Sequence, residues 1–269
     1  MIRRGIFIGL CVLLLSLVVV PSIRAQIFEI PEGQRAQYRQ QLETYRTAEH
    51  TFTIAKEQYE KLQTLVSLED AVRSTQQGML ARVTVLQSFM EMTRLQLEQT
   101  SGIDLTTKDT QLKQDDSVIE KLKAHRLAVE ASNDRTKILQ VALEYLTLSA
   151  EVNDAGYHSL AMINYGQLQT IYDKTIAIRD DVTATVEQNE KNPLVLSEKR
   201  RALDEINRSV ETVNTQLVDA REDLKPSKSS ARSFYSRSRY NSYVDNLSDI
   251  YGNLSRNLDY LQEIMKGSN

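Results

Sequence analysis

The sequence contains very few of the residues that end helices. It has no tryptophan, and its 269 residues include only nine glycines and four prolines. Glycine and proline mark most chain reversals, so a chain with so few of them has few turns. The abundant residues, among them Gln, Leu, Glu, Lys and Arg, favour helices, and no stretch has the alternating pattern of a strand. Long helices are therefore expected throughout.

Cysteine and histidine are almost as scarce, which limits metal and redox chemistry. The one cysteine, Cys11, lies in an apolar run near the N-terminus, so the rest of the chain has no disulfide and no sulfur-ligated metal site. The three histidines, His50, His125 and His158, fall on separate expected helices. Neither the Glu-x-x-His pair of di-iron bundles nor a His-x-x-x-His pair for zinc occurs. We expect no metal and no cofactor. For His158, near Gly156 and Asp154, a structural or solvated histidine is expected, and a functional one is the alternative.

The sequence also lacks recognisable catalytic motifs. The glycines are too scattered for a phosphate-binding loop, and no serine has the context of a nucleophile elbow. Two acidic pairs, Asp115 with Asp116 and Asp180 with Asp181, are predicted to lie on exposed faces, because adjacent helical residues do not converge on one point. A net charge of −3 gives no field that would attract nucleic acid. The sequence therefore predicts a protein that is not an enzyme and does not bind nucleic acid.

The N-terminus has the pattern of an export leader. Arg3 and Arg4 precede a run from Ile6 to Val20 without a charged residue, and Ala25 follows shortly after. These are the basic, apolar and small-residue parts of a secretory signal peptide, which we assign to residues 1–25. An uncleaved anchor is the alternative, although the run is shorter than the roughly twenty residues that span a bilayer. The mature chain is predicted to be periplasmic, cell-surface or extracellular.

The clearest helical signal lies between Leu203 and Leu224. Apolar residues recur there at alternating intervals of three and four, at Leu203, Ile206, Val210, Val213, Leu217, Ala220 and Leu224. This spacing predicts a narrow coiled-coil seam, which must be covered by another helix. Because the flanking positions lack opposed charges, we expect the seam to close within the same chain.

Three further long segments show a similar period. A helix is expected from near Gln34, with a stripe that includes Tyr38, Leu42 and Tyr45, and it either continues past Ser67 or is followed there by a second helix ending near Thr100. Another helix is expected over 107–131. Asn192 followed by Pro193 predicts the start of the helix that carries the Leu203–Leu224 seam.

The segment 138–152 is apolar on nearly every side, which predicts a helix at the centre of a bundle. The alternative is a segment that enters a membrane, as in secreted helical pore-forming toxins. After this segment the period loosens between 153 and 166, where Asp154, Gly156, Asn164 and Gly166 predict a kink or a break.

The combined prediction is an all-α fold: an elongated bundle of long antiparallel helices with coiled-coil-like packing. The bundle is assigned to residues 26–224. A linker follows at 225–241 and an amphipathic helix at 242–269, which packs on the bundle.

The linker is basic and rich in serine and tyrosine. Its five candidate binding residues are Lys225, Lys228, Arg232, Arg237 and Arg239, and the linker contains no acidic residue. Basic residues mixed with aromatic ones can bind an anionic polymer or an anionic lipid. The alternative is an ordinary solvated linker between helices.

These features predict a non-enzymatic exported helical bundle with a structural or binding role in the cell envelope or at the cell surface. Its partners would be other envelope or surface proteins that contact its helical faces, while its oligomeric state stays open. In outline the chain also resembles the minor pilus subunits of type IV secretion machines, through a leader, a short lead-in with Ile27 and Phe28, and a long helix with Gln and Tyr from Gln34. That resemblance implies a role in pilus or channel assembly. A secreted pore-forming toxin is the third hypothesis.

Overall fold

The computed structural model describes residues 32–225 and 237–266, and within these ranges it is entirely helical apart from short turns. Leader, lead-in and most of the basic linker lie outside the described residues. The helices are α2 (Glu32–Leu62), α3 (Leu65–Gln99), α4 (Leu105–Glu130), α5 (Arg135–Asn189), α6 (Pro193–Asp223) and α7 (Arg237–Lys266). The predicted all-α bundle is confirmed.

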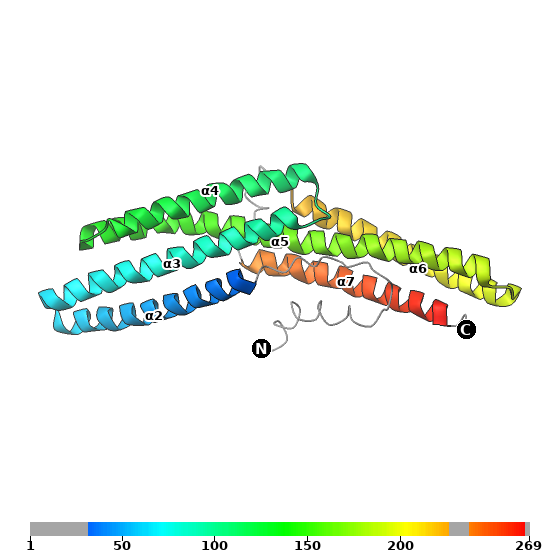
Figure 1. The fold of residues 1–269 in the computed structure, drawn as a ribbon, viewed down its shortest axis with the longest axis horizontal. Helices are drawn as coiled ribbons and strands as arrows, with labels where there is room; N and C mark the ends of the chain where they lie inside the picture. The colour runs from blue at the N-terminus through cyan, green and yellow to red at the C-terminus, as the bar shows by residue number, and fades with distance from the viewer. Residues whose placement is uncertain (1–31, 226–236, 267–269) are drawn as a thin grey trace.

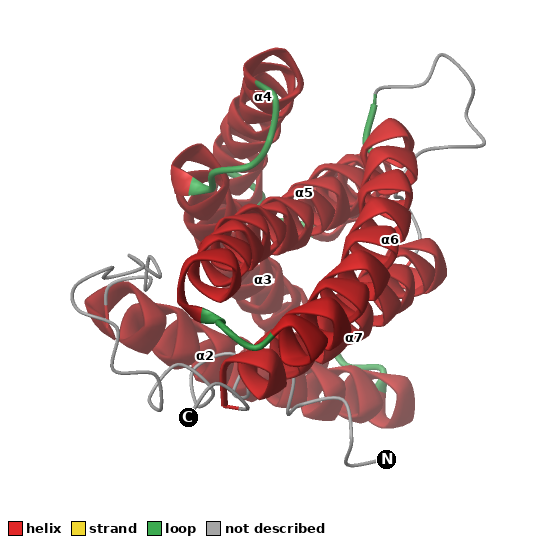
Figure 2. Ribbon diagram, turned by 90° about the vertical axis from the view of Figure 1, so that its right-hand side faces the viewer, coloured by secondary structure: helices red, strands yellow, loops and turns green. Residues whose placement is uncertain are grey.

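The long helix α5 is the axis of the molecule. With 55 residues it is about 80 Å long. Helices α3 and α4 pack along its N-terminal half, whereas α6 and α7 pack along its C-terminal half, and α2 packs on α3 (Figure 1). The end-on view in Figure 2 shows α6 and α7 beside α5 at one end. The bundle is elongated because different helices cover the two halves of α5.

Polar side chains cap the helices close to where the sequence indicates. Asp134 accepts a hydrogen bond from the Lys137 amide at 2.9 Å and caps α5, and Asn192 caps α6 with Pro193 in its first turn. At the start of α3, Thr64 and Ser67 form a reciprocal capping box. A second helix thus follows α2, with Ser67 as the internal partner in the box instead of the cap itself.

The predicted break at 153–166, which was the alternative to a kink, is wrong, because α5 continues through this segment. Gly166 has a packing role: a Cβ atom there would lie 2.4 Å from the carbonyl oxygen of Ser101 in the α3–α4 turn. The turn itself needs Gly102, whose φ is +80° and whose own Cβ would lie 2.7 Å from the Gly166 carbonyl oxygen. The two glycines let the α3–α4 turn cross the middle of α5 in direct contact.

The core forms three clusters along the molecule. One lies between α3, α4 and α5, and a central one brings α5, α6 and α7 together around residues such as Met162, Leu217 and Ile250. A third, at the α5–α6 turn, contains Val186 and Ile206. All seven residues of the predicted α6 seam are buried, and they pack against α5 and α7. The seam therefore closes within the chain, as predicted.

Candidate functional site

The predicted basic residues are only partly described. Lys225 is exposed after α6, and its Nζ contacts Glu222 Oε1 at 2.6 Å. Lys228 and Arg232 lie outside the described residues. Arg237 is exposed and Arg239 is partly exposed, and both belong to the first turn of α7, which begins five residues before the expected start at 242. Binding of an anionic partner by these residues stays a prediction.

The histidines lie on separate helices, as expected. No group of three or more His, Cys, Asp or Glu residues that could hold a metal ion occurs in the described part of the chain. His158 Nε2 lies 2.9 Å from the carbonyl oxygen of Leu224, where a carbonyl can only accept, so Nε2 carries the proton. Burial lowers the pKa of His158. This contact joins α5 to the end of α6, which is a structural role.

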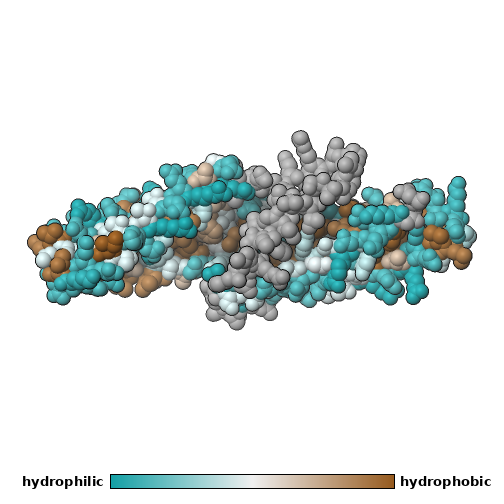
Figure 3. Space-filling model, turned by 90° about the horizontal axis from the view of Figure 1, so that it is seen from below, coloured by the Kyte–Doolittle hydropathy of each residue, from teal (hydrophilic) through white to brown (hydrophobic). Residues whose placement is uncertain are grey.

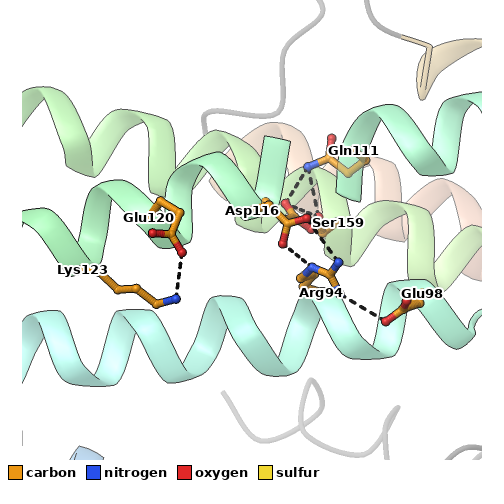
Figure 4. A network of polar contacts seen from close by, with 8 residues as sticks. Arg94, Glu98, Gln111, Asp116, Glu120, Lys123 and Ser159 are labelled. Atoms are coloured by element: carbon orange, nitrogen blue, oxygen red, sulfur yellow. Dashed lines mark hydrogen bonds and ion pairs between the residues drawn. The ribbon is translucent and has the colours of Figure 1, made fainter. Parts of the chain in front are cut away.

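One predicted exposed pair is in fact divided between surface and core. Asp116 is exposed and forms an ion pair with Arg94 of α3, with Nε to Oδ1 at 2.5 Å (Figure 4). Its neighbour Asp115 is 0% exposed. The prediction that both carboxylates are solvated is therefore wrong, because adjacent residues on a helix face different directions.

Asp115 is held in a buried cluster with Gln111 of α4 and Ser159 of α5. Ser159 Oγ donates to Asp115 at 2.9 and 2.7 Å, and Gln111 Nε2 donates to Asp115 Oδ1 at 2.9 Å. Gln111 Nε2 also lies 3.1 Å from Ser159 Oγ (Figure 4). It lies 3.3 Å from the Ala155 carbonyl oxygen. The bonds from Ser159 to Asp115 and from Gln111 to Ser159 and Ala155 run between α4 and α5 and fix the register of the two helices.

Burial raises the pKa of Asp115 to about 6, and the bonds from Ser159 and Gln111 lower it in part. A carboxylate with a raised pKa is a candidate general acid or base when substrate can reach it. Here Asp115 and Ser159 are both 0% exposed and Gln111 is 2% exposed. The geometry accordingly supports a structural contact between helices.

The sequence held a signal for this cluster. Counting back from Val129 by alternating steps of four and three gives His125, Leu122, Val118, Asp115 and Gln111, and all of these residues are buried. This is the same spacing as the α6 seam. The stripe was missed because three of its members are polar.

The segment 138–152 does not lie at the centre of the bundle, contrary to expectation. It forms the N-terminal part of α5, and only one side of it is buried, with Ile138, Val141, Leu148 and Val152 in the core. On the other side, Leu139, Leu143 and Leu146 are 54%, 67% and 65% exposed. The three exposed leucines follow three-and-four spacing, so they form one stripe. We call them the α5 leucine face. They are exposed because α3 and α4 cover only the opposite side of this part of α5.

The remaining surface is mostly hydrophilic. Figure 3 shows separate apolar patches at both ends of one face of the molecule. Exposed apolar residues lie at the α2–α3 turn, where Leu62, Leu65 and Val66 are 63%, 70% and 68% exposed, and at the start of α6, where Leu194 is 78% exposed. None of the described helices has an apolar stretch long enough to cross a membrane.

Shallow grooves also occur on the surface of the described chain. One lies over α3, where the Arg82 guanidinium stacks between the rings of Tyr45 and Tyr145 at 5.8 and 5.3 Å from their centroids. Another lies between α6 and α7 and includes the buried amide of Asn257.

Comparison with known proteins gives no match: no family model, no curated protein and no solved structure corresponds to this chain.

Proposed function

We propose that this chain is a non-enzymatic exported protein that acts as a rigid helical spacer and binds another envelope or surface protein. The observation that carries the proposal is the α5 leucine face. Three leucines that are each more than half exposed, on one stripe of a long helix, form an apolar strip of the kind that a partner helix covers.

The surroundings of the leucine face support binding to protein. Gln140, Glu144 and Thr147 are exposed beside it, and Ala150 continues the stripe by one more turn. An apolar strip with a polar rim is typical of a helix–helix interface. The burial of Asp115, which keeps a substrate from reaching its carboxylate, fits a role without catalysis.

The test is quantitative capture of partners from the native envelope after cross-linking. The variant carries Leu139→Gln, Leu143→Gln and Leu146→Gln, which remove apolar contact from positions that are already exposed, so folding is preserved. We expect recovery of the partner to fall by about tenfold or more, since each well-packed leucine contributes on the order of 1 kcal/mol or more. The matched control is Leu194→Gln, at the most exposed leucine of the opposite end.

Four outcomes would replace the proposal or part of it. Unchanged recovery with the triple variant would reject the leucine face as the binding surface. Accumulation of the full chain, residues 1–25 included, in the cytosol would reject export. Release of dye from liposomes by the purified protein would favour the toxin hypothesis, while capture of secretion-machine subunits would identify the pilus alternative.

A further inference from the structure

The groove between α6 and α7 combines an unsatisfied amide with unpaired charges. Its walls include Glu205 and Ser209 from α6 and Arg256, Asn257, Tyr260 and Glu263 from α7. It lies at the opposite half of α5 from the leucine face, among the helices that cover the C-terminal part. A separate explanation is therefore needed for this surface.

Asn257 occupies a seam position of α7. It follows Ile250 and Leu254 and precedes Leu261 at the three-and-four spacing of the buried residues of that helix. Its side chain is only 2% exposed, and its Nδ2 has no hydrogen-bond partner in the described chain. A buried donor without an acceptor is destabilising, whereas a single asparagine in a helical seam commonly specifies the partner helix.

The charges beside Asn257 also lack ionic partners. Arg256 donates only to the Gly252 carbonyl oxygen, at 3.4 Å, and to Asn253 Oδ1, and no ion pair joins it to a carboxylate within the described residues. Glu263 likewise forms no ion pair with a cation among the described residues. Arg256 and Glu263 are seven residues apart, which is about two helical turns, so both lie on the same face of α7.

We propose that this groove is the interface for a second copy of the chain, with the two α7 helices antiparallel about a two-fold axis midway between Arg256 and Glu263. The argument is charge complementarity. An antiparallel copy places the Arg256 guanidinium opposite the partner's Glu263, and symmetry repeats the pair, so one surface satisfies itself. This inference does not depend on export or on the α5 leucine face.

The same arrangement accounts for an exposed aromatic ring. Tyr260, which is 55% exposed, lies beside the proposed axis and packs against the partner helix there.

The test is sedimentation velocity over a range of concentrations, using the full chain in the form in which it accumulates in cells that make it. The wild type is expected to dimerise. Arg256→Glu or Glu263→Arg alone turns both ion pairs into like-charge contacts, and we expect the dimer Kd to rise by about tenfold or more. The double variant with both changes restores opposite charges, and its Kd is expected to return towards that of the wild type.

The matched control is Arg208→Glu, which reverses an exposed charge on α6 outside the groove and is expected to leave the Kd unchanged. Circular dichroism of each variant checks that the helices remain folded. A wild type that stays monomeric at every concentration would overturn the inference. So would a dimer that is insensitive to the single reversals, or one that the double variant fails to restore.

Discussion

Helices α2 and α6 carry similar apolar stripes, yet the two stripes are buried to different extents. All seven stripe residues of α6 are buried, whereas Ala55 is the only buried residue of α2. The cause is the number of neighbours: α6 packs against both α5 and α7, while α2 packs mainly on α3. A periodic stripe thus identifies which face of a helix makes contact, but the number of covering helices sets how much of it is buried.

The largest expected effect tests this comparison directly by shortening one stripe leucine on each helix. Leu217 of α6 is 1% exposed, and Leu217→Ala is expected to lower the free energy of unfolding by about 2–5 kcal/mol, because it leaves a cavity. Leu42→Ala on α2 removes a partly exposed side chain, so we expect a loss of less than about 1.5 kcal/mol. Urea unfolding measures both, and equal losses would contradict the difference between the two helices.

The second test concerns Asp115, a carboxylate within the buried stripe of α4. The stripe of α6, by comparison, is wholly apolar. The pKa of Asp115 is about 6 in the folded protein and about 4 when unfolded, so the folded chain takes up a proton first as pH falls. The contribution of Asp115 to the free energy of unfolding is therefore fully present below about pH 4 and is lost as pH rises through about 6. The full change is at most about 3 kcal/mol.

Unfolding free energies of wild type and Asp115→Asn at pH 7 and pH 4.5 measure this change. As pH is lowered over this range, the wild type should gain stability relative to the variant, because only the wild type can take up the proton. Asp116→Asn, at the exposed neighbour, is the matched control. A pH-dependent difference of equal size in the control would show that the effect does not come from Asp115.

The third test concerns the crossing at the middle of α5, which joins the two differently covered halves. Gly166→Ala places a methyl group against the Ser101 carbonyl oxygen, and we expect a loss of about 1–3 kcal/mol in unfolding free energy. The control is Gly252→Ala on α7, where nothing lies within 4 Å of the added Cβ. There we expect a gain of about 0.5–1 kcal/mol, because alanine favours the helix. A gain at both positions would show that the crossing tolerates a side chain.

The smallest effects come from single contacts that hold each helix to its neighbour. Tyr243→Phe removes the hydrogen bond from Tyr243 Oη to the Ala220 carbonyl oxygen at 3.1 Å, between α7 and α6, with an expected loss of about 0.5–1.5 kcal/mol. Arg82→Gln removes the stacking on Tyr45 and Tyr145, with an expected loss of about 0.5–1 kcal/mol. Hydrogen exchange should show the Arg82 variant loosening α2 and the Tyr243 variant loosening α7; uniform loosening in both would contradict local effects.

Much of the fold follows from local signals. The α6 seam and the cap at Asn192 are determined by neighbouring residues, so the sequence alone predicts them. The sequence left open whether a new helix starts near Ser67, and the structure shows that α3 does. The continuity of α5 was not predictable in this way. Glycine has a low helix propensity, so Gly166 suggests a break. Its role depends on another part of the chain, because the α3–α4 turn lies where a side chain at position 166 would be.

The surface features depended even more on tertiary structure. The leucines at 139, 143 and 146 have the composition of a core segment, and only the positions of α3 and α4 leave them exposed. Asp115 was predicted to be exposed because it is adjacent to Asp116, although its place in a regular stripe with Val118 and Leu122 indicated burial. The leader and the central linker residues lie outside the described chain and stay predictions.

The unbroken α5 also determines the distance between the turns at its two ends. Because one continuous helix runs through both halves, no loop lies between them, and the α4–α5 and α5–α6 turns are held about 80 Å apart. The Gly102–Gly166 contact lies near the middle of α5 and supports the helix there. A molecule bound at one end of α5 would thereby be held at a fixed distance from a molecule bound at the other end.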